Sequence, residues 1–220
     1  MARMVAVTMA RVMLVILAVL AGAPFARAAD APVRIVALGD SLTAGYGLPA
    51  QAAFPVRLEA ALRGKGLAVE VANAGVSGDT TSGGLERLDW SVPEGTDAVI
   101  LELGANDALR GVEPAVTRAS LDTILHRLAE RRIAVLLAGM RAPPNMGADY
   151  VGSFDAIFPQ LAAAHDVVFY PFFLDGVAAD RALNQGDGLH PTSQGVDLIV
   201  THILPKAEEL VARVKARRAP

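Results

Sequence analysis

The chain has 220 residues, 53% of them hydrophobic, and a formal net charge of −3 at pH 7. The apolar content excludes intrinsic disorder, and 20 irregularly spaced Gly together with 13 Pro exclude a collagen-like or coiled-coil protein. Cysteine is absent, which excludes disulfide bonds, a thiol nucleophile and a thiolate metal site.

The first 28 residues have the composition of a signal peptide. Of these, 22 are hydrophobic, two arginines give a positive start, and residues 12–26 are uncharged. Ala26 and Ala28 are small residues two positions apart, which is the pattern that signal peptidase accepts. A membrane anchor is the alternative, but the uncharged run is short against the roughly 20 residues that span a bilayer. We predict cleavage after Ala28, export to the periplasm of a Gram-negative bacterium or out of the cell, and no stable membrane anchor.

Residues 29–220 have the composition of one soluble domain. About half of them are hydrophobic, and 17 basic against 23 acidic residues give this part a net charge of −6. Nucleic-acid-binding proteins need a basic face, so we expect no nucleic-acid partner. No internal repeat, low-complexity tract or linker divides the segment, and we expect a monomer of a single domain.

Short apolar runs alternate with helical patterns along this domain. Apolar runs without alternation are typical of strands buried on both faces. Five of them interleaved with helices predict a parallel sheet covered on both sides, and right-handed crossovers restrict it to a doubly wound open sheet. We expect a three-layer α/β/α, flavodoxin-like fold. We expect strands at 33–38, 68–72, 98–103, 133–138 and 166–170, and helices at 54–63, from 113 past 128, at 154–164 and at 191–213.

Polar clusters follow the first three of these strands, and a fourth cluster follows the fifth strand. Sites in doubly wound sheets lie at the carboxyl ends of the strands, so we expect the four clusters to lie at one edge. They are Gly39–Leu42, Asn73–Asp79, Gly104–Asp107 and Asp187–His190.

Ser41 is the candidate nucleophile. It follows a buried strand and a glycine, and it opens a turn into a helix. The free N–H groups and partial positive charge of a helix start favour a developing oxyanion. Ser is also a favoured N-cap residue, and the residues around Ser41 fit either role equally well. The choice depends on whether a base is available.

His190 is the candidate base. It stands three residues after Asp187 in a glycine-containing loop. A carboxylate there can hold the imidazole in one tautomer and leave the other ring nitrogen to accept the serine proton, as in a Ser-His-Asp triad. The alternative is a turn-forming Asp and a His that merely starts a helix. The other histidines are expected to be structural or exposed: His126, His165 and His202.

An oxyanion needs preorganised donors. The candidates are the backbone N–H of Ser41, the N–H of Gly78, which allows close approach, and the side-chain amide of Asn106. Asn106 is also compatible with an ordinary turn. One eligible histidine is too few for a metal centre, so we expect none. Neighbouring acids are expected to fix the loops by accepting backbone hydrogen bonds: Asp40, Asp79 and Asp107.

Together these clusters resemble the four blocks of the SGNH (GDSL) hydrolases. The matching residues are Gly39–Leu42, Gly78, Gly104–Asp107 and Asp187–His190, in the family's order and across nearly the whole domain. Further stretches are similar to the thioesterase I branch, whose members act as acyl-CoA thioesterases, lysophospholipases and arylesterases. Ala105 is a departure, because that branch often has Gly at this position.

The resemblance implies roles for five residues and a function. Ser41 is then the nucleophile, His190 the base and Asp187 its orienter, while Ser41, Gly78 and Asn106 supply the oxyanion donors. It implies a serine esterase that hydrolyses carboxylic esters and thioesters, lysophospholipid among them, through an acyl-enzyme and without a cofactor.

Two other functions compete with this interpretation. A carbohydrate O-acetyl esterase of the same family is the first, although one Trp and 5% aromatic residues favour acyl chains over sugars. The second is a flavodoxin-like binding module, either a flavin carrier or a phospho-acceptor receiver with Asp40 at a strand end. Export away from kinases and the lack of Lys near strand ends disfavour the receiver.

The segment 141–150 follows the fourth strand at the same edge. With Leu109 and Phe173, its Met146 is expected to line an acyl groove. The alternative is an ordinary surface connection.

Overall fold

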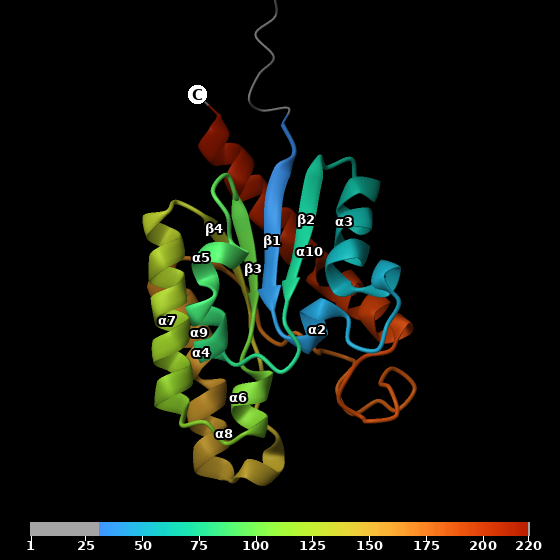
Figure 1. Cartoon of the computed structure of the whole chain (residues 1–220), viewed down its shortest axis with the longest axis vertical. Helices are drawn as coiled ribbons and strands as arrows, with labels where there is room; N and C mark the ends of the chain where they lie inside the picture. Colours follow the sequence, from blue (N-terminus) through green and yellow to red (C-terminus); the bar gives the residue numbers. More distant parts are fainter. Residues whose placement is uncertain (1–30, 220) are drawn as a thin grey trace, which may run out of the picture. The chain divides into compact units, whose positions relative to one another are not determined.

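The computed structural model describes residues 31–219. The predicted signal peptide lies outside the described residues. The domain is built on a five-stranded, all-parallel sheet in the order β2-β1-β3-β4-β5 (Figure 1). The strands are β1 (Val33–Gly39), β2 (Val69–Gly75), β3 (Ala98–Glu102), β4 (Ala134–Ala138) and β5 (Val168–Tyr170).

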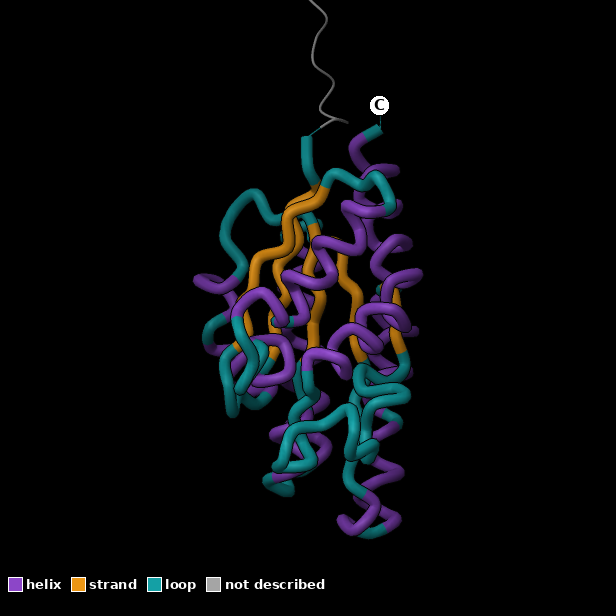
Figure 2. The backbone as a smooth tube through the Cα atoms, turned by 90° about the vertical axis from the view of Figure 1, so that its right-hand side faces the viewer, coloured by secondary structure: helices purple, strands orange, loops and turns teal. Residues whose placement is uncertain are grey.

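Helices cover both faces of the sheet (Figures 1 and 2). From β1 the chain steps to β2 on one side, whereas β3, β4 and β5 follow on the other side. Because crossovers are right-handed, this reversal places the helix of the first connection on the face opposite the later ones. One layer holds α3 (Phe54–Gly64) and α10 (Ser193–Arg218), and the other holds α4 (Thr81–Glu86), α7 (Pro114–Glu130) and α9 (Ile157–His165). The predicted three-layer fold is confirmed.

Some predicted boundaries differ from the observed ones. The stretch predicted as one helix at 154–164 belongs to two helices, α8 (Ala148–Asp155) and α9. The break precedes Pro159, which donates no N–H and whose ring clashes with the carbonyl four residues earlier. β5 begins at Val168 because Asp166 adopts a left-handed conformation with φ of 47°. The last helix continues five residues past its predicted end, and no helix within residues 31–219 is long and apolar enough to cross a bilayer.

The carboxyl ends of β1, β2 and β3 finish level with one another. Gly39 is paired in register with Gly75 on β2 and with Glu102 on β3. Short helices begin within three residues of two of these ends, α2 (Ser41–Ala44) after β1 and α6 (Ala105–Leu109) after β3. The segments that carry the polar clusters therefore start side by side at one edge of the sheet.

The apolar face of α7 provides a test of the core. Leu121→Ala should lower the free energy of unfolding by about 2–5 kcal/mol, because this fully buried side chain would leave a cavity. Val116→Ala on the same helix is the matched control, since Val116 is 46% exposed and such changes stay within about 0.5 kcal/mol. Urea denaturation followed by circular dichroism measures both, and equal midpoints would contradict the assigned core face.

Candidate active site

Ser41 is the first residue of α2, and only Asp40 separates it from the end of β1. The preceding Asp40 caps the helix, and its Oδ1 accepts the N–H of Leu42 at 2.9 Å. A Cβ at Gly39 would lie 2.1 Å from Thr43 Oγ1, so only glycine fits the end of the strand. Ser41 itself is 8% exposed and lines a pocket at this edge of the sheet. The Ser41 hydroxyl therefore faces the pocket, although the turn around it is buried.

Asp187 and His190 come from the loop before α10. Asp187 Oδ1 accepts the backbone N–H of Leu189 at 2.9 Å and of His190 at 3.0 Å. The other oxygen, Oδ2, lies 2.6 Å from His190 Nδ1. The hydrogen bonds from His190, side chain first, lower the pKa of Asp187 to about 2. The carboxylate is therefore charged at neutral pH and fixes the imidazole from one side.

The second ring nitrogen of His190 reaches the serine. His190 Nε2 lies 3.0 Å from Ser41 Oγ, although the two residues are 149 positions apart in the sequence. The ring of Tyr46 packs against the imidazole with centroids 4.5 Å apart, and Tyr46 is held by Gln185, whose Nε2 donates to its carbonyl at 2.8 Å. With Nδ1 bound to Asp187, Nε2 is free to accept the serine proton.

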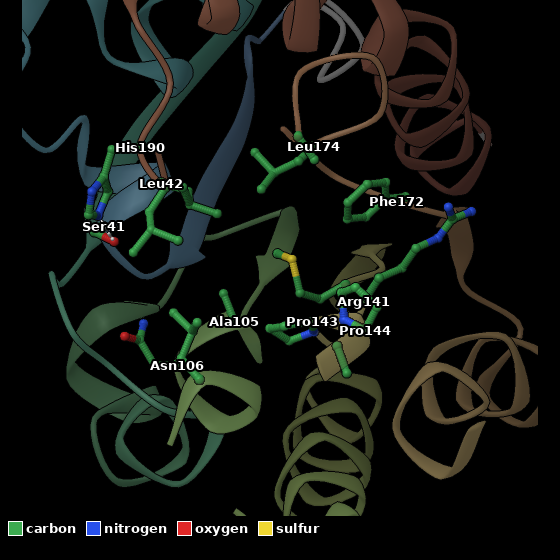
Figure 3. Close-up of a pocket in the computed structure, with 15 residues that line it drawn as sticks. Ser41, Leu42, Ala105, Asn106, Arg141, Pro143, Pro144, Phe172, Leu174 and His190 are labelled. Carbon is green, nitrogen blue, oxygen red and sulfur yellow. Dashed lines mark hydrogen bonds between the residues drawn. The ribbon is translucent and has the colours of Figure 1, made fainter. Parts of the chain in front are cut away.

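Asn106 faces the same pocket from α6 (Figure 3). Its Nδ2 donates to Asp40 Oδ2 at 3.0 Å. An amide nitrogen carries two hydrogens, so this bond uses one of them and leaves the other available to a ligand. The pair ties α6 to the residue before the serine.

Gly78 lies in the connection between β2 and α4. Its φ of 83° is in the left-handed region, which favours glycine. Its carbonyl accepts a hydrogen bond from Arg110 Nη2 at 2.7 Å. Since Arg110 directly follows α6, this contact links the Gly78 segment to the helix that carries Asn106.

Arg87 is a buried arginine that holds several segments of the site together. This role was not predicted from the sequence. Arg87 is 6% exposed and donates to the carbonyls of Gly39 and Ala74, both at 2.8 Å, and to Asp79 Oδ2 at 2.6 Å. It therefore holds the ends of β1 and β2 and the residue after Gly78 in one arrangement. The only sign in the sequence is one basic residue in the stretch Leu85–Leu88, which is a weak signal.

Two of the three expected loop-fixing acids accept backbone N–H groups. Asp40 binds the N–H of Leu42, and Asp107 binds the N–H of Thr81 at 2.9 Å. Asp79 differs, because its partner is the Arg87 side chain. The remaining histidines pair with acidic residues elsewhere: His126 with Glu130, His165 with Asp122 and His202 with Asp175.

The pocket has a volume of about 430 Å³ and a mostly apolar wall. Leu109 lines it, as expected. Met146 and Phe173 do not: Phe173 is 1% exposed and packs edge-to-face on Phe54, with centroids 5.0 Å apart. The neighbouring Phe172 forms the wall instead (Figure 3).

Only the first part of the segment after β4 lines the pocket, whereas Met146 was also expected to line it. Its first residues, 141–144, line the pocket, and Arg141 stacks over Phe172 with its guanidinium carbon 4.8 Å from the ring centroid. A 3-10 helix, η3 (Pro144–Met146), and the start of α8 follow. Met146 is turned away, with its methyl carbon 3.5 Å from where a Cβ on Gly111 would lie.

A hydrogen-bonded Ser, His and Asp at the carboxyl edge of a doubly wound sheet are the parts of a serine hydrolase. The comparisons agree. The model of the GDSL-like lipase/acylhydrolase family matches residues 37–198, and the chain belongs to this family.

Characterised relatives resemble the chain over most of its length. It is 38% identical over 185 residues to an arylesterase of Vibrio mimicus, covering 84% of this chain and 91% of the relative. It is 38% identical over 186 residues to thioesterase 1/protease 1/lysophospholipase L1 of Escherichia coli, covering 84% and 88%. The crystal structure of AlinE4, an SGNH-hydrolase family esterase, superposes with a TM-score of 0.69 at 46% identity, covering 81% of this chain and 96% of that one.

The Asp187–His190 contact provides a test of the site. Asp187→Asn should lower kcat by roughly 10⁴-fold, because an amide cannot hold the same tautomer. Asp122→Asn is the matched control, since Asp122 lies at the same 2.6 Å from another histidine, His165. Steady-state hydrolysis of a 4-nitrophenyl ester measures both variants. Similar kcat values for the two would show that Asp187 does not orient a working base.

Proposed function

We propose that this chain is a serine ester hydrolase that uses Ser41 as nucleophile, His190 as base and Asp187 as its orienter. The observation that carries the proposal is the continuous series of contacts from Asp187 through His190 to Ser41, which ends at the mouth of an apolar pocket. The esterase and thioesterase relatives support the same chemistry.

In the first step Ser41 Oγ attacks the carbonyl carbon of the ester. The new C–O bond forms while His190 Nε2 takes the hydroxyl proton, and the carbonyl π electrons move to the oxygen. Backbone N–H groups of Ser41 and Gly78 and the free amide hydrogen of Asn106 stabilise that oxyanion. Asp187 stabilises the imidazolium that results.

In the second step the tetrahedral intermediate collapses. The bond to the leaving oxygen or sulfur breaks, and His190 gives its proton to the departing alcohol or thiol. Water then attacks the acyl-enzyme with His190 again as base, which releases the carboxylic acid and restores the Ser41 hydroxyl. These steps need no redox change.

The pocket favours an acyl chain as the group that is bound. Its volume of about 430 Å³ is well above the roughly 150 Å³ of a cavity that encloses benzene. The wall is built mainly from aliphatic, proline and aromatic side chains such as Leu42, Leu109 and Phe172. An acetylated sugar would place hydroxyl groups against this surface without partners. Acyl esters and thioesters, lysophospholipid included, therefore fit better than O-acetylated carbohydrate.

Ser41→Ala tests the proposal. We expect turnover of 4-nitrophenyl butyrate to fall by at least about 10³-fold, because the residue that forms the acyl-enzyme is removed. Ser120→Ala on α7, another buried serine, should hydrolyse the ester at the unmodified rate. Circular dichroism confirms that both variants fold. Undiminished turnover in Ser41→Ala would refute the assignment of the nucleophile.

The composition of residues 1–28 supports export with removal of the leader, and we propose that the mature protein is a monomer. Expression of the full chain in a Gram-negative host should give a periplasmic protein whose intact mass corresponds to residues 29–220. A chain of full mass that stays with the membranes would instead indicate an uncleaved anchor.

A further inference from the structure

A second buried acid lies directly behind the nucleophile turn. Glu102 ends β3, has 0% exposure, and its Oε2 accepts the Thr43 hydroxyl at 2.7 Å. The backbone N–H groups of Asp40 and Thr43 also donate toward this carboxyl. A Cβ at Gly39 would come within 2.6 Å of Oε2, so the absent side chain of Gly39 is what admits the acid.

Three hydrogen-bond donors favour a negative charge on Glu102, but its burial and a neighbouring acid oppose that charge more strongly. Its Oε1 has no hydrogen-bond partner among the described residues, and Asp40 is a neighbouring acid. The nearby cation Arg87 is already paired with Asp79. A buried carboxylate with an unpartnered oxygen and no counter-ion is costly, whereas the neutral acid is much less so. Burial, and secondly Asp40, accordingly raise the pKa of Glu102 well above its usual range.

The pKa of Asp40 is also raised, but less. Burial raises it, whereas the hydrogen bonds from the Leu42 N–H and from Asn106, together with His190, lower it, and the net pKa is about 6. Asp79 is the one further acid that opposes it. Of the two buried carboxyls, Asp40 is therefore the one that carries a charge at neutral pH.

We propose that Glu102 is a positioning residue of the active site, which as an un-ionised acid holds the first turn of α2 through Thr43 and leaves Asp40 as the single charged carboxyl that orients Asn106. The proposal rests on the esterase function proposed above. Glu102 does not touch the substrate. It fixes the direction of the Ser41 hydroxyl and N–H, and it keeps a second negative charge away from the developing oxyanion.

This role predicts effects on kcat with little change in KM. Thr43→Val and Glu102→Ala should each lower kcat by about 10- to 100-fold, because the serine turn loses its fixed orientation. Glu102→Gln is neutral and nearly isosteric, and its kcat should stay within about threefold of the unmodified value. Glu59→Gln is the matched control: Glu59 also accepts a backbone N–H, that of Val71 at 2.6 Å, but it lies on α3 away from the pocket.

The pH profile separates positioning from simple packing. If Glu102 is un-ionised, Glu102→Gln removes no charge, and the acid limb of kcat should coincide with that of the unmodified enzyme. An ionised Glu102 would favour protonation of the groups around it, Asp40 among them, so its neutralisation would move the acid limb to lower pH. Such a shift, or a Glu102→Gln variant as slow as Glu102→Ala, would overturn the proposal, as would unchanged kcat in both Thr43→Val and Glu102→Ala.

The rate of Ser41 labelling by a fluorophosphonate provides a readout that does not depend on the substrate. Labelling of the unmodified chain tests the proposed hydrolase chemistry, and the ratio between variants tests Glu102. We expect Thr43→Val and Glu102→Ala to label at least about tenfold more slowly, with Glu102→Gln near the unmodified rate. Equal rates for all variants would refute the role of Glu102 while leaving the hydrolase intact. If Glu102→Ala does not fold, Thr43→Val carries the test.

Discussion

The site depends on one constraint: three neighbouring parallel strands end at the same level. Gly39 pairs with both Gly75 and Glu102, so three segments leave the sheet at adjacent strand spacings of about 5 Å. No single element carries all the residues of the proposed site. The serine follows β1, the Asn106 amide follows β3, and the histidine arrives from the loop before α10. A shift of register would separate groups whose contacts are 3.0 Å long.

Polar groups buried behind this edge give the site its rigidity. Charges in a protein interior are tolerated when each finds partners, and here the partners are parts of the site itself. Arg87 binds two strand-end carbonyls and Asp79, while Asp107 joins α4, α6 and α7 through Thr81 and Thr117. The hydrogen bonds that compensate burial are thus the same ones that hold the segments of the proposed site in place, and oxyanion chemistry requires such preorganisation.

The parts of the molecule that could be predicted are those whose signal is local. Buried strands show as apolar runs, so all five strands and the parallel fold were accessible from the sequence. Asp187 and His190 are three residues apart in a short loop, so their side chains can be expected to lie close together. The sequence could not indicate whether Phe172 or Phe173 lines the pocket. Both follow the end of β5, where no periodic pattern predicts which side chain faces the pocket. The role of Arg87 could not be predicted from the sequence, because its main partners are backbone carbonyls. Every residue has a backbone carbonyl, so no sequence pattern marks these partners.

The long separation between Ser41 and His190 affects when the protein can act. A chain emerging from the ribosome has its serine, Asp40 and Asn106 long before the loop that precedes α10 exists. Contacts of such high sequence separation form late, because the intervening chain must be ordered first. In the proposed mechanism, hydrolytic reactivity therefore arises only when synthesis and folding are nearly complete. A chain truncated before residue 190 keeps the hydroxyl but lacks the proposed base, so the mechanism leaves it with little of the activity.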